Sequence, residues 1–373
     1  MKFVVNKDDL LDGIRIVERA TVLKGLQPVL ANILIETVGN NQLKLSATDF
    51  DLSITTLIDA NIESEGKFTL PAKKLGEIIS RLQDELVSLE LIGSSVNITC
   101  KNSKFDIIGI SANEFPVIEE EITGGESIEI DAKPFMKSIK HVISAAAGYE
   151  TNNLLSGVVC TIDKNILEMA ATDGNRLART REAVENNATE NGEAFEMLIS
   201  SKVFAELSKI ALITDANNIK ISKENKKVII TIDKTKMIAR LMHGQFPKYN
   251  QLIPQTFPRE AVVNKNLLIA ALERVAIMVN EKHSIVKFYF ADNTLTLSGA
   301  SPETGNSKDE IEIQYNAAPL EIAFNYKFVL DFLKTADVDE IKVKLNESLS
   351  ATVLAPCSGD DYIYLVMPVQ LRG

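Results

Sequence analysis

The sequence predicts an α+β fold in which one kind of domain is repeated three times, and three observations predict it. Two helical patterns recur at about one third of the 373-residue length. The stretches between them alternate apolar and polar residues, as strands do. These strands outnumber the helices and seldom alternate with them one to one, which favours mainly antiparallel sheets with helices packed on them.

Each repeat is expected to contain two helices, because six stretches have a polar start and then apolar residues at helical spacing. The first helices are expected over Lys7–Lys24, Asp131–Gly148 and Asn264–Lys282. The second helices are expected over Pro71–Leu82, Ser200–Leu212 and Asn325–Asp337. Pro71 suits a first helical turn.

The strand-like runs and their turns lie between these helices, and each repeat ends in a strand followed by a proline. Two aperiodic stretches, near Glu119–Ile128 and Leu252–Glu260, are the expected linkers. The predicted domains are therefore residues 1–120, 128–252 and 260–373.

One turn stands out within the repeats. Residues 167–176 match residues 43–52 in register, and 295–301 is a weaker third copy. Asp173 and Gly174 suit a tight turn between two strands. The turn is expected to expose Arg176 beside Leu177, a polar donor next to an apolar anchor. Asp49 and Asp173 occupy equivalent turns of different repeats, so turn formation is preferred over a catalytic carboxylate pair.

Composition excludes several classes of protein. The chain is 45% hydrophobic and 24% charged, and it lacks an apolar run of about 18 residues, so no membrane association is expected. Its three cysteines are widely spaced, which favours a reducing cytoplasm over disulfides. A formal net charge of −11 taken alone argues against nucleic-acid binding. The six expected helices are net basic, however, while the rest is acidic, which favours a shared basic surface for phosphates.

Signatures of catalysis and cofactor binding are missing. The sequence has no phosphate-binding glycine loop and no nucleophile elbow, and its three histidines are isolated. We therefore expect no catalytic residue, no metal and no cofactor. A peptide-binding scaffold that does not bind DNA, or an enzyme of unrecognised type on the same repeat, is the alternative interpretation.

The whole chain resembles the bacterial sliding clamp family, the beta subunit of DNA polymerase III. The resemblance rests on the order and spacing of several short motifs. They are Met1-Lys-Phe, Pro71-Ala-Lys-Lys74, Ala171-Thr-Asp-Gly-Asn-Arg-Leu177, Gln245-Phe-Pro-Lys-Tyr249, Ile322-Ala-Phe-Asn325 with Val329-Leu-Asp331, and Tyr364-Leu-Val-Met-Pro-Val-Gln-Leu371. It implies three DNA-clamp domains per chain, a head-to-tail homodimer closed into a ring, and basic helices that line a hole for double-stranded DNA.

The resemblance also implies a groove for short partner peptides. Its residues would be Leu155, Thr172, Gly174, Asn175, Arg176, Leu177, Pro247, Leu252, Phe328, Leu349, Val366, Met367, Pro368, Val369 and Leu371. The DNA polymerase III alpha subunit, the clamp loader, other polymerases and repair proteins would insert Gln- and Leu/Phe-containing peptides there. The chain departs from the family pattern at Asn175, Gln251, Gln370, His283 and the Arg372-Gly373 end.

Two further sets of residues follow from the resemblance and the repeat. Sequence-independent DNA contacts are expected from Lys24, Lys73, Lys74, Lys137, Lys202 and Lys265. The dimer interface is expected at Phe105, Ile107, Ile277 and Met278, with the strand 104–108 of one chain against domain three of the other. The expected location is the cytoplasm, in association with the nucleoid.

Overall fold

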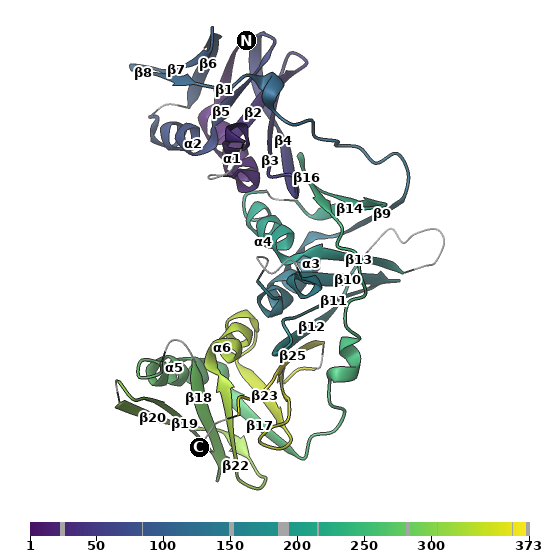
Figure 1. Ribbon diagram of the computed structural model, residues 1–373, viewed down its shortest axis with the longest axis vertical. Helices are drawn as coiled ribbons and strands as arrows, with labels where there is room; N and C mark the ends of the chain where they lie inside the picture. The colour runs from purple at the N-terminus through teal and green to yellow at the C-terminus, as the bar shows by residue number, and fades with distance from the viewer. Residues whose placement is uncertain are drawn as a thin grey trace. The chain divides into compact units, whose positions relative to one another are not determined.

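The computed structural model describes residues 1–22, 27–83, 85–148, 153–185, 194–214, 216–280, 284–303, 305–359 and 361–370. Within these ranges the chain forms two compact units, drawn as ribbons in Figure 1. The first unit contains the described parts of 1–132 and 205–241, and the second those of 133–185, 194–204 and 242–370.

The first unit is built on one antiparallel sheet. Its strands are β1 (Lys2–Asn6), β2 (Asn32–Val38), β3 (Gln42–Thr48), β4 (Leu52–Ser64), β5 (Lys67–Pro71), β6 (Leu86–Ile92), β7 (Ser95–Cys100), β8 (Ser103–Ile108), β9 (Glu126–Asp131), β14 (Asn218–Glu224), β15 (Lys227–Ile232) and β16 (Thr235–Arg240). The order is β8-β7-β6-β1-β4-β16-β15-β14-β9, with β3 paired to β4, β2 to β3 and β5 to β2. Strand β8 therefore lies at an edge of this sheet.

Helices α1 (Lys7–Val17) and α2 (Ala72–Arg81) pack against each other in the first unit. The side chains of Leu10, Ile14, Leu75 and Ile79 are fully buried. In each helix the two residues are four positions apart, a spacing that puts them on one face. The Asn6 side chain accepts a hydrogen bond from the backbone of Asp8 at 2.8 Å and so begins α1.

The second unit contains two antiparallel sheets. Its strands are β10 (Gly157–Asp163), β11 (Ile166–Thr172), β12 (Arg176–Ala183), β13 (Phe195–Ser200), β17 (Arg259–Asn264), β18 (Ile285–Ala291), β19 (Thr294–Ser301), β20 (Gly305–Glu312), β21 (Gln314–Tyr315), β22 (Leu320–Asn325), β23 (Glu340–Leu345), β24 (Thr352–Pro356) and β25 (Tyr362–Val366). The larger sheet has the order β13-β10-β11-β12-β25-β24-β23-β17-β21, and the smaller β20-β19-β18-β22. Strand β20 lies at an edge of the smaller sheet.

Helices α5 (Lys265–Ala276) and α6 (Tyr326–Thr335) pack together in the second unit. Their first turns are capped alike, because the side chains of Asn264 and Asn325 each accept a backbone hydrogen bond at 3.1 Å. The other two helices are α3 (Ala132–Val142) and α4 (Ser201–Ile210). Within the second unit the rings of Phe135 and Phe204 join them edge to face at 6.0 Å.

All six helices are confirmed, but the first helix of each repeat is shorter than the sequence predicted. Helix α1 ends at Val17 and is followed by the 3-10 turn Glu18–Ala20. Helix α3 ends at Val142 and is followed by the 3-10 turn Ile143–Ala145. Apolar spacing does not distinguish a last α-helical turn from a 3-10 turn, since both bury the same face.

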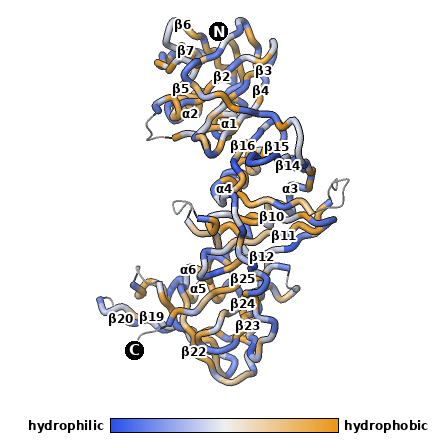
Figure 2. The backbone as a smooth tube through the Cα atoms, turned by 45° about the vertical axis from the view of Figure 1, so that its right-hand side comes forward, coloured by the Kyte–Doolittle hydropathy of each residue, from blue (hydrophilic) through white to orange (hydrophobic). Residues whose placement is uncertain are grey.

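Hydrophobic and hydrophilic residues alternate along many strands in Figure 2. In β14, for example, Ile219 and Ile221 are fully buried while Asn218 and Lys220 are exposed. This period of two is the pattern that predicted strands here. It places one face of the sheet on the core.

In each unit one sheet continues from one repeat into the next. Strand β4 of the first repeat pairs with β16 of the second, with Ile54 opposite Met237. Strand β12 of the second repeat pairs with β25 of the third, with Ala178 opposite Tyr364. The same two strands of the repeat are therefore used at both junctions.

Candidate functional site

The loop Asp173–Arg176 is a rigid turn held by its own side chains. Asp173 Oδ1 accepts hydrogen bonds from the backbone nitrogens of Asn175 at 2.8 Å and Arg176 at 3.0 Å. Thr172 Oγ1 accepts from the nitrogen of Gly174 at 3.1 Å and donates to the carbonyl of Arg176 at 2.6 Å. Gly174 has a φ of +92°, which a side chain rarely permits. The turn predicted from the sequence is thus present, and the backbone nitrogens of Gly174, Asn175 and Arg176 all have hydrogen-bond partners.

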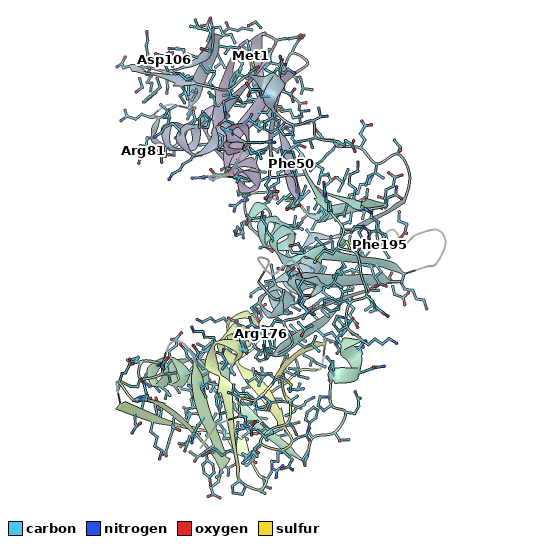
Figure 3. All side chains as sticks on the ribbon, viewed as in Figure 1. Met1, Phe50, Arg81, Asp106, Arg176 and Phe195 are labelled. Carbon is cyan, nitrogen blue, oxygen red and sulfur yellow. The ribbon has the colours of Figure 1, made fainter. Side chains whose placement is uncertain are left out.

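The equivalent turn of the first repeat shows what is particular to this loop. There Phe50, labelled in Figure 3, takes the place of Gly174 with a φ of +73° and is 50% exposed. Asp49 Oδ1 accepts from the backbone of Asp51 and Leu52, just as Asp173 does from its own turn. The two turns share their hydrogen bonds but differ in the side chain at the tip and in the arginine that follows.

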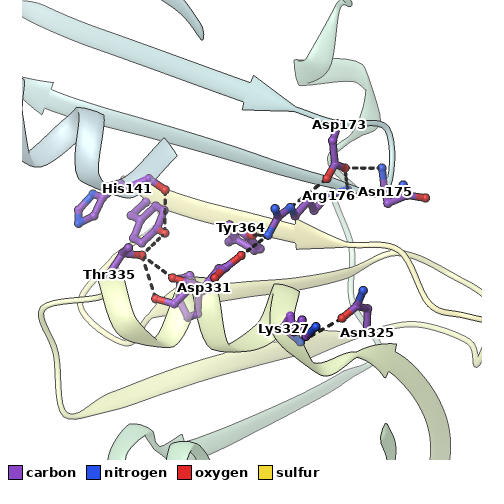
Figure 4. A network of polar contacts seen from close by, with 11 residues as sticks. His141, Asp173, Asn175, Arg176, Asn325, Lys327, Asp331, Thr335 and Tyr364 are labelled. Carbon is purple, nitrogen blue, oxygen red and sulfur yellow. Dashed lines mark hydrogen bonds and ion pairs between the residues drawn. The ribbon is translucent and has the colours of Figure 1, made fainter. Parts of the chain in front are cut away.

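Arg176 is the centre of a polar network that joins the loop to helix α6 (Figure 4). Its Nε donates to Asp173 Oδ2 at 3.0 Å, and its Nη1 contacts Asp331 Oδ2 and the Tyr364 hydroxyl. Its guanidinium carbon lies 4.2 Å from the ring centroid of Phe328, a cation–π contact.

These partners keep the guanidinium charged. Burial alone would lower the pKa of Arg176, but Tyr364, Asp331 and Asp173 together raise it above its usual value. The expectation that the turn exposes Arg176 beside Leu177 is not met: the Arg176 side chain is 12% exposed and Leu177 only 1%. Arg176 is therefore engaged within the protein through its Nε and Nη1 groups.

The end of the chain lies directly beside this loop. Arg176 is opposite Val366 in the β12–β25 pair, and the nitrogen of Met367 donates to the carbonyl of Asn175 at 2.8 Å. The nitrogen of Val369 donates to the carbonyl of Ala323 at 2.8 Å, which holds Val369 against β22. The structure therefore brings together the two segments that the resemblance assigned to one groove.

Only some side chains of the predicted groove are open to a ligand. Met367 is 41% exposed, and Gly174 and Asn175 are exposed, whereas Thr172 and Val366 are buried. Phe328, Pro368 and Val369 are half-buried. The accessible apolar surface beside the loop is thus provided mainly by Met367 and its two successors.

The remaining groove residues lie on other segments of the second unit. Leu252 and Leu349 are 55% and 60% exposed, Pro247 is exposed, and Leu155 is half-buried. No hydrogen bond described in the structure ties these four to the Asp173–Arg176 loop, so their place in one groove stays a prediction. Leu371 lies outside the described residues.

The predicted DNA-contacting lysines differ in their surroundings. Lys73 and Lys74 are exposed on α2, and Lys74 pairs with Glu77 at 3.0 Å. Lys137 is exposed on α3 and pairs with Glu182 at 2.7 Å.

Lys202 and Lys265 are half-buried at the starts of α4 and α5. Lys265 Nζ donates to the carbonyl of Ala336 at 2.9 Å. Lys24 lies outside the described residues. Their common role in DNA binding stays a prediction.

The predicted interface residues lie on sheet edges or helix ends. Phe105 on β8 is 38% exposed and Ile277, just after α5, is 76% exposed, while Met278 is half-buried. Ile107 is only 8% exposed, because it faces the core opposite Val96. Ile108, which the sequence did not single out, is 75% exposed on the other face.

Two sets of side-chain contacts, those of Arg176 and that of Tyr249, could not be predicted from the sequence. Asp331 and Tyr364 each belong to a motif, but no spacing indicates that both contact Arg176. Tyr249 donates its hydroxyl hydrogen to Glu168, which ties the segment before domain three to β11. Only an alignment of related sequences could have linked such distant pairs.

Three domain profiles match the chain almost end to end. Those of the DNA polymerase III beta subunit match residues 1–119 (N-terminal domain), 129–248 (central domain) and 250–370 (C-terminal domain). The beta sliding clamp of Synechococcus elongatus is 32% identical, and that of Pseudomonas putida 26%, over 100% of both chains.

Solved structures of similar proteins have the same fold. The DNA polymerase III beta subunit of Thermotoga maritima superimposes with a TM-score of 0.91 at 31% identity and 100% coverage of both chains. The sliding clamp of Pseudomonas aeruginosa bound to griselimycin gives 0.90 at 25% identity, again over 100% of both chains.

Three repeated α+β domains with antiparallel sheets, joined between repeats, define a clamp-type protein, which confirms the predicted fold class. The chain belongs to the DNA polymerase III beta subunit family, the beta sliding clamps. Its role is accordingly that of a non-catalytic clamp subunit in DNA replication. Among the described residues, no helix has the length and apolar character needed to cross a membrane.

Proposed function

We propose that two copies of this chain close head to tail into a ring around duplex DNA and tether polymerases and other replication and repair proteins to it. The observation that carries the proposal is the repeated strand pairing of β4 with β16 and of β12 with β25. The second repeat pairs one strand, β16, with the repeat before it and another, β12, with the repeat after it.

If two copies pair in the same way as consecutive repeats do, one strand at each end of the chain is available for the contact between them. In the first repeat β8 stands where β16 and β25 stand in the others, and in the third repeat β20 stands where β4 and β12 stand. Both are sheet edges within the described part of the chain. Open edges are ready to pair with another chain, and a head-to-tail contact of two such chains closes a ring.

Comparison of equivalent hairpins in the three repeats supports one register for this proposed contact. Phe105 pairs with Ile98 as Met237 pairs with Ile230, and Ser307 pairs with Gly299 as Ala178 pairs with Ala171. Because Ile54 faces Met237 and Ala178 faces Tyr364 at the two known junctions, Phe105 of one copy should face Ser307 of the other.

The register sets Lys104 directly opposite Lys308, which is unfavourable, but it places opposite charges at diagonal positions. It places Asp106 opposite Asn306 and diagonal to Lys308, and it places Lys104 diagonal to Glu310. Diagonal neighbours of opposite charge on adjacent strands attract each other. Phe105 would meanwhile lie on the core side near Ile277, where its exposed ring area would be covered.

DNA would pass through the ring without sequence recognition. Exposed lysines on α2 and α3 support phosphate contacts, and the acidic remainder of the chain would repel DNA elsewhere. Such contacts are screened by salt, so the ring can slide while its topology retains it.

Partner proteins would bind beside the Asp173–Arg176 loop. The exposed Met367 supports an adaptable apolar contact, and the fixed loop supports a preorganised one. We propose the polymerase alpha subunit, the clamp loader, other polymerases and repair proteins as partners through short peptides. The protein would accordingly act in the cytoplasm, on the nucleoid.

The direct test is retention on circular DNA. The protein, loaded by its clamp loader onto a nicked circular plasmid, should elute with that DNA in gel filtration. Cutting the plasmid once should release the protein. Equal retention on circular and linear DNA would show ordinary binding and contradict encirclement.

A further inference from the structure

A second cleft lies in the second unit, and no residue of the Asp173–Arg176 loop lines it. It has a volume of about 430 Å³ and opens between residues 250–257 and one face of strands β12, β23, β24 and β25. In Figure 1 these residues belong to the green segment that precedes β17. None of the residues that line the cleft belongs to the predicted peptide groove.

The walls of the cleft are fixed by packing. Ile253 and Phe257 pack on the cluster of Val353 and Ile363, which are 1% and 8% exposed. At the start of the same segment, the Tyr249 hydroxyl donates to Glu168 on β11. The cleft is therefore a preformed site with one apolar wall, and a ligand would not need to order it.

The charges that line the cleft are all positive. Arg179, Arg181 and Lys344 contribute to the lining, and among the described residues no carboxylate does. Arg179 is 9% exposed, and the Lys344 nitrogen lies 6.0 Å from the ring centroid of Phe257. Glu168 pairs with Arg181. Burial would raise the pKa of Glu168, but the hydrogen bond from Tyr249 and the charges of Arg181 and Arg179 together lower it. One carboxylate thus lies beside two guanidinium groups, and the lining itself is positive.

We propose that this cleft is a second peptide-binding site, which takes an acidic segment of a partner protein with one bulky apolar side chain among its carboxylates. The carboxylates would meet Arg179, Arg181 and Lys344, and the apolar side chain would lie on Ile253 and Phe257. Side-chain amides of Asn250 and Gln255 at the lining can hydrogen-bond the peptide backbone.

The size and lining favour a peptide over nucleic acid. A volume of about 430 Å³ holds a few side chains but does not admit a duplex. An apolar wall gains from covering a leucine or isoleucine and gains nothing from a phosphate. This site does not depend on the proposed ring, and no predicted groove residue lines it, although Ile253 and Phe257 pack on a cluster that includes Leu177.

The test uses the full-length protein and a fluorescein-labelled peptide, Gly-Asp-Asp-Ile-Asp-Gly, in fluorescence anisotropy. Lys344→Gln should weaken its binding about fivefold, because one partly exposed charge pair is removed. Lys342→Gln is the matched control, since Lys342 lies two residues away on the same strand but outside the cleft, and it should bind as wild type does. Thermal melting checks that both variants are folded.

Three further measurements complete the test. The peptide with Asn in place of each Asp should bind about tenfold more weakly, because it lacks the charges. A Gln-Leu-x-Leu-Phe peptide that occupies the predicted groove should not displace the acidic peptide. Equal affinity for both peptides, or equal effects of Lys344→Gln and Lys342→Gln, would overturn the proposal. Displacement by duplex DNA would assign the cleft to phosphate and overturn it too.

Discussion

Arg176 is held by Asp173, Asp331, Tyr364 and Phe328, and so its role is to fix the loop against helix α6. The Arg176 side chain is 12% exposed, and its carboxylate partners Asp173 and Asp331 are 15% and 38% exposed. Removing the Asp331 carboxylate leaves the guanidinium with Asp173 as its one remaining carboxylate partner and costs a charge-assisted hydrogen bond.

Asp331→Asn should therefore lower the free energy of unfolding by about 1–3 kcal/mol, as measured by urea denaturation. Asp337→Asn is the control, because Asp337 pairs with the exposed Lys140 at the surface and should cost little. An Asp331 variant as stable as the Asp337 variant would contradict the structural role of the Arg176 network.

Met367 offers the largest accessible apolar side chain next to that loop, at 41% exposed. Met367→Ala should weaken a labelled Gln-Leu-x-Leu-Phe peptide about tenfold, because the truncated side chain leaves the peptide less apolar area to cover. Met367→Leu should retain most of the affinity, since its volume is similar. The dimer should be intact in both variants. Equal affinity of wild type and Met367→Ala would remove Met367 from the site.

His141 makes stability depend on pH. It is 3% exposed and stacks on the Tyr362 ring at 4.0 Å, and its Nδ1 lies 3.5 Å from Thr180 Oγ1. Burial, assisted by Lys137 and Lys140 and opposed by Asp337, lowers the pKa of His141 from 6.5 to about 4. The unfolded chain therefore binds this proton more readily than the folded chain.

His141 should cost stability as the pH falls from about 6.5 towards 4, by roughly 3 kcal/mol in all. Above pH 6.5 the residue is neutral in both states and the stability is fully present. The measurement is urea denaturation of wild type and His141→Gln across this range, because the difference cancels other titrating groups. Parallel curves for the two proteins would contradict a neutral buried His141.

At the scale of elements, helices and strands could be predicted because their periods appear in the sequence itself. Leu10 and Ile14 predict the buried face of α1, and the asparagine before α5 marks its first turn. The ends of α1 and α3 could not be predicted, because a 3-10 turn continues the same apolar face. The Arg176–Asp331 contact spans 155 residues of sequence, and no local pattern reports it.

The proposed seam between copies depends on two segments, the edge strand β8 and the residues that follow α5. Replacing Ile277 and Met278 with Glu should give monomers in sedimentation velocity, because two charges would be desolvated in an apolar contact. Leu212→Glu is the control: Leu212 is 88% exposed and lies on neither edge strand, so that variant should be dimeric. A dimer in both cases would contradict this seam.

At the scale of the whole molecule, the sequence predicted a basic set of helices in an acidic chain, but it did not show how the ring closes. Replacing Lys73 and Lys74 with Glu should flatten the salt dependence of DNA binding. Removal of one phosphate contact lowers the slope of log K against log salt by about 0.9. Lys67→Glu with Lys226→Glu carries the same charge change on exposed sheet and turn positions and should leave the slope unchanged. Equal slopes for the two pairs would contradict a basic lining.

The central claim is that β8 of one copy pairs with β20 of another and so closes a ring around DNA. Asp106→Cys with Asn306→Cys tests it in a chain whose three native cysteines are Ala, because the proposed register sets these positions opposite each other. Asp106→Cys with Glu312→Cys is the control, because Glu312 also lies on β20 but is too far from position 106 of the other copy to form a disulfide in this register. After loading onto circular plasmid and oxidation, the first variant should stay on the circle through denaturation with SDS and leave it when the plasmid is cut. Loss from the intact circle, or equal retention of the control, would contradict the account.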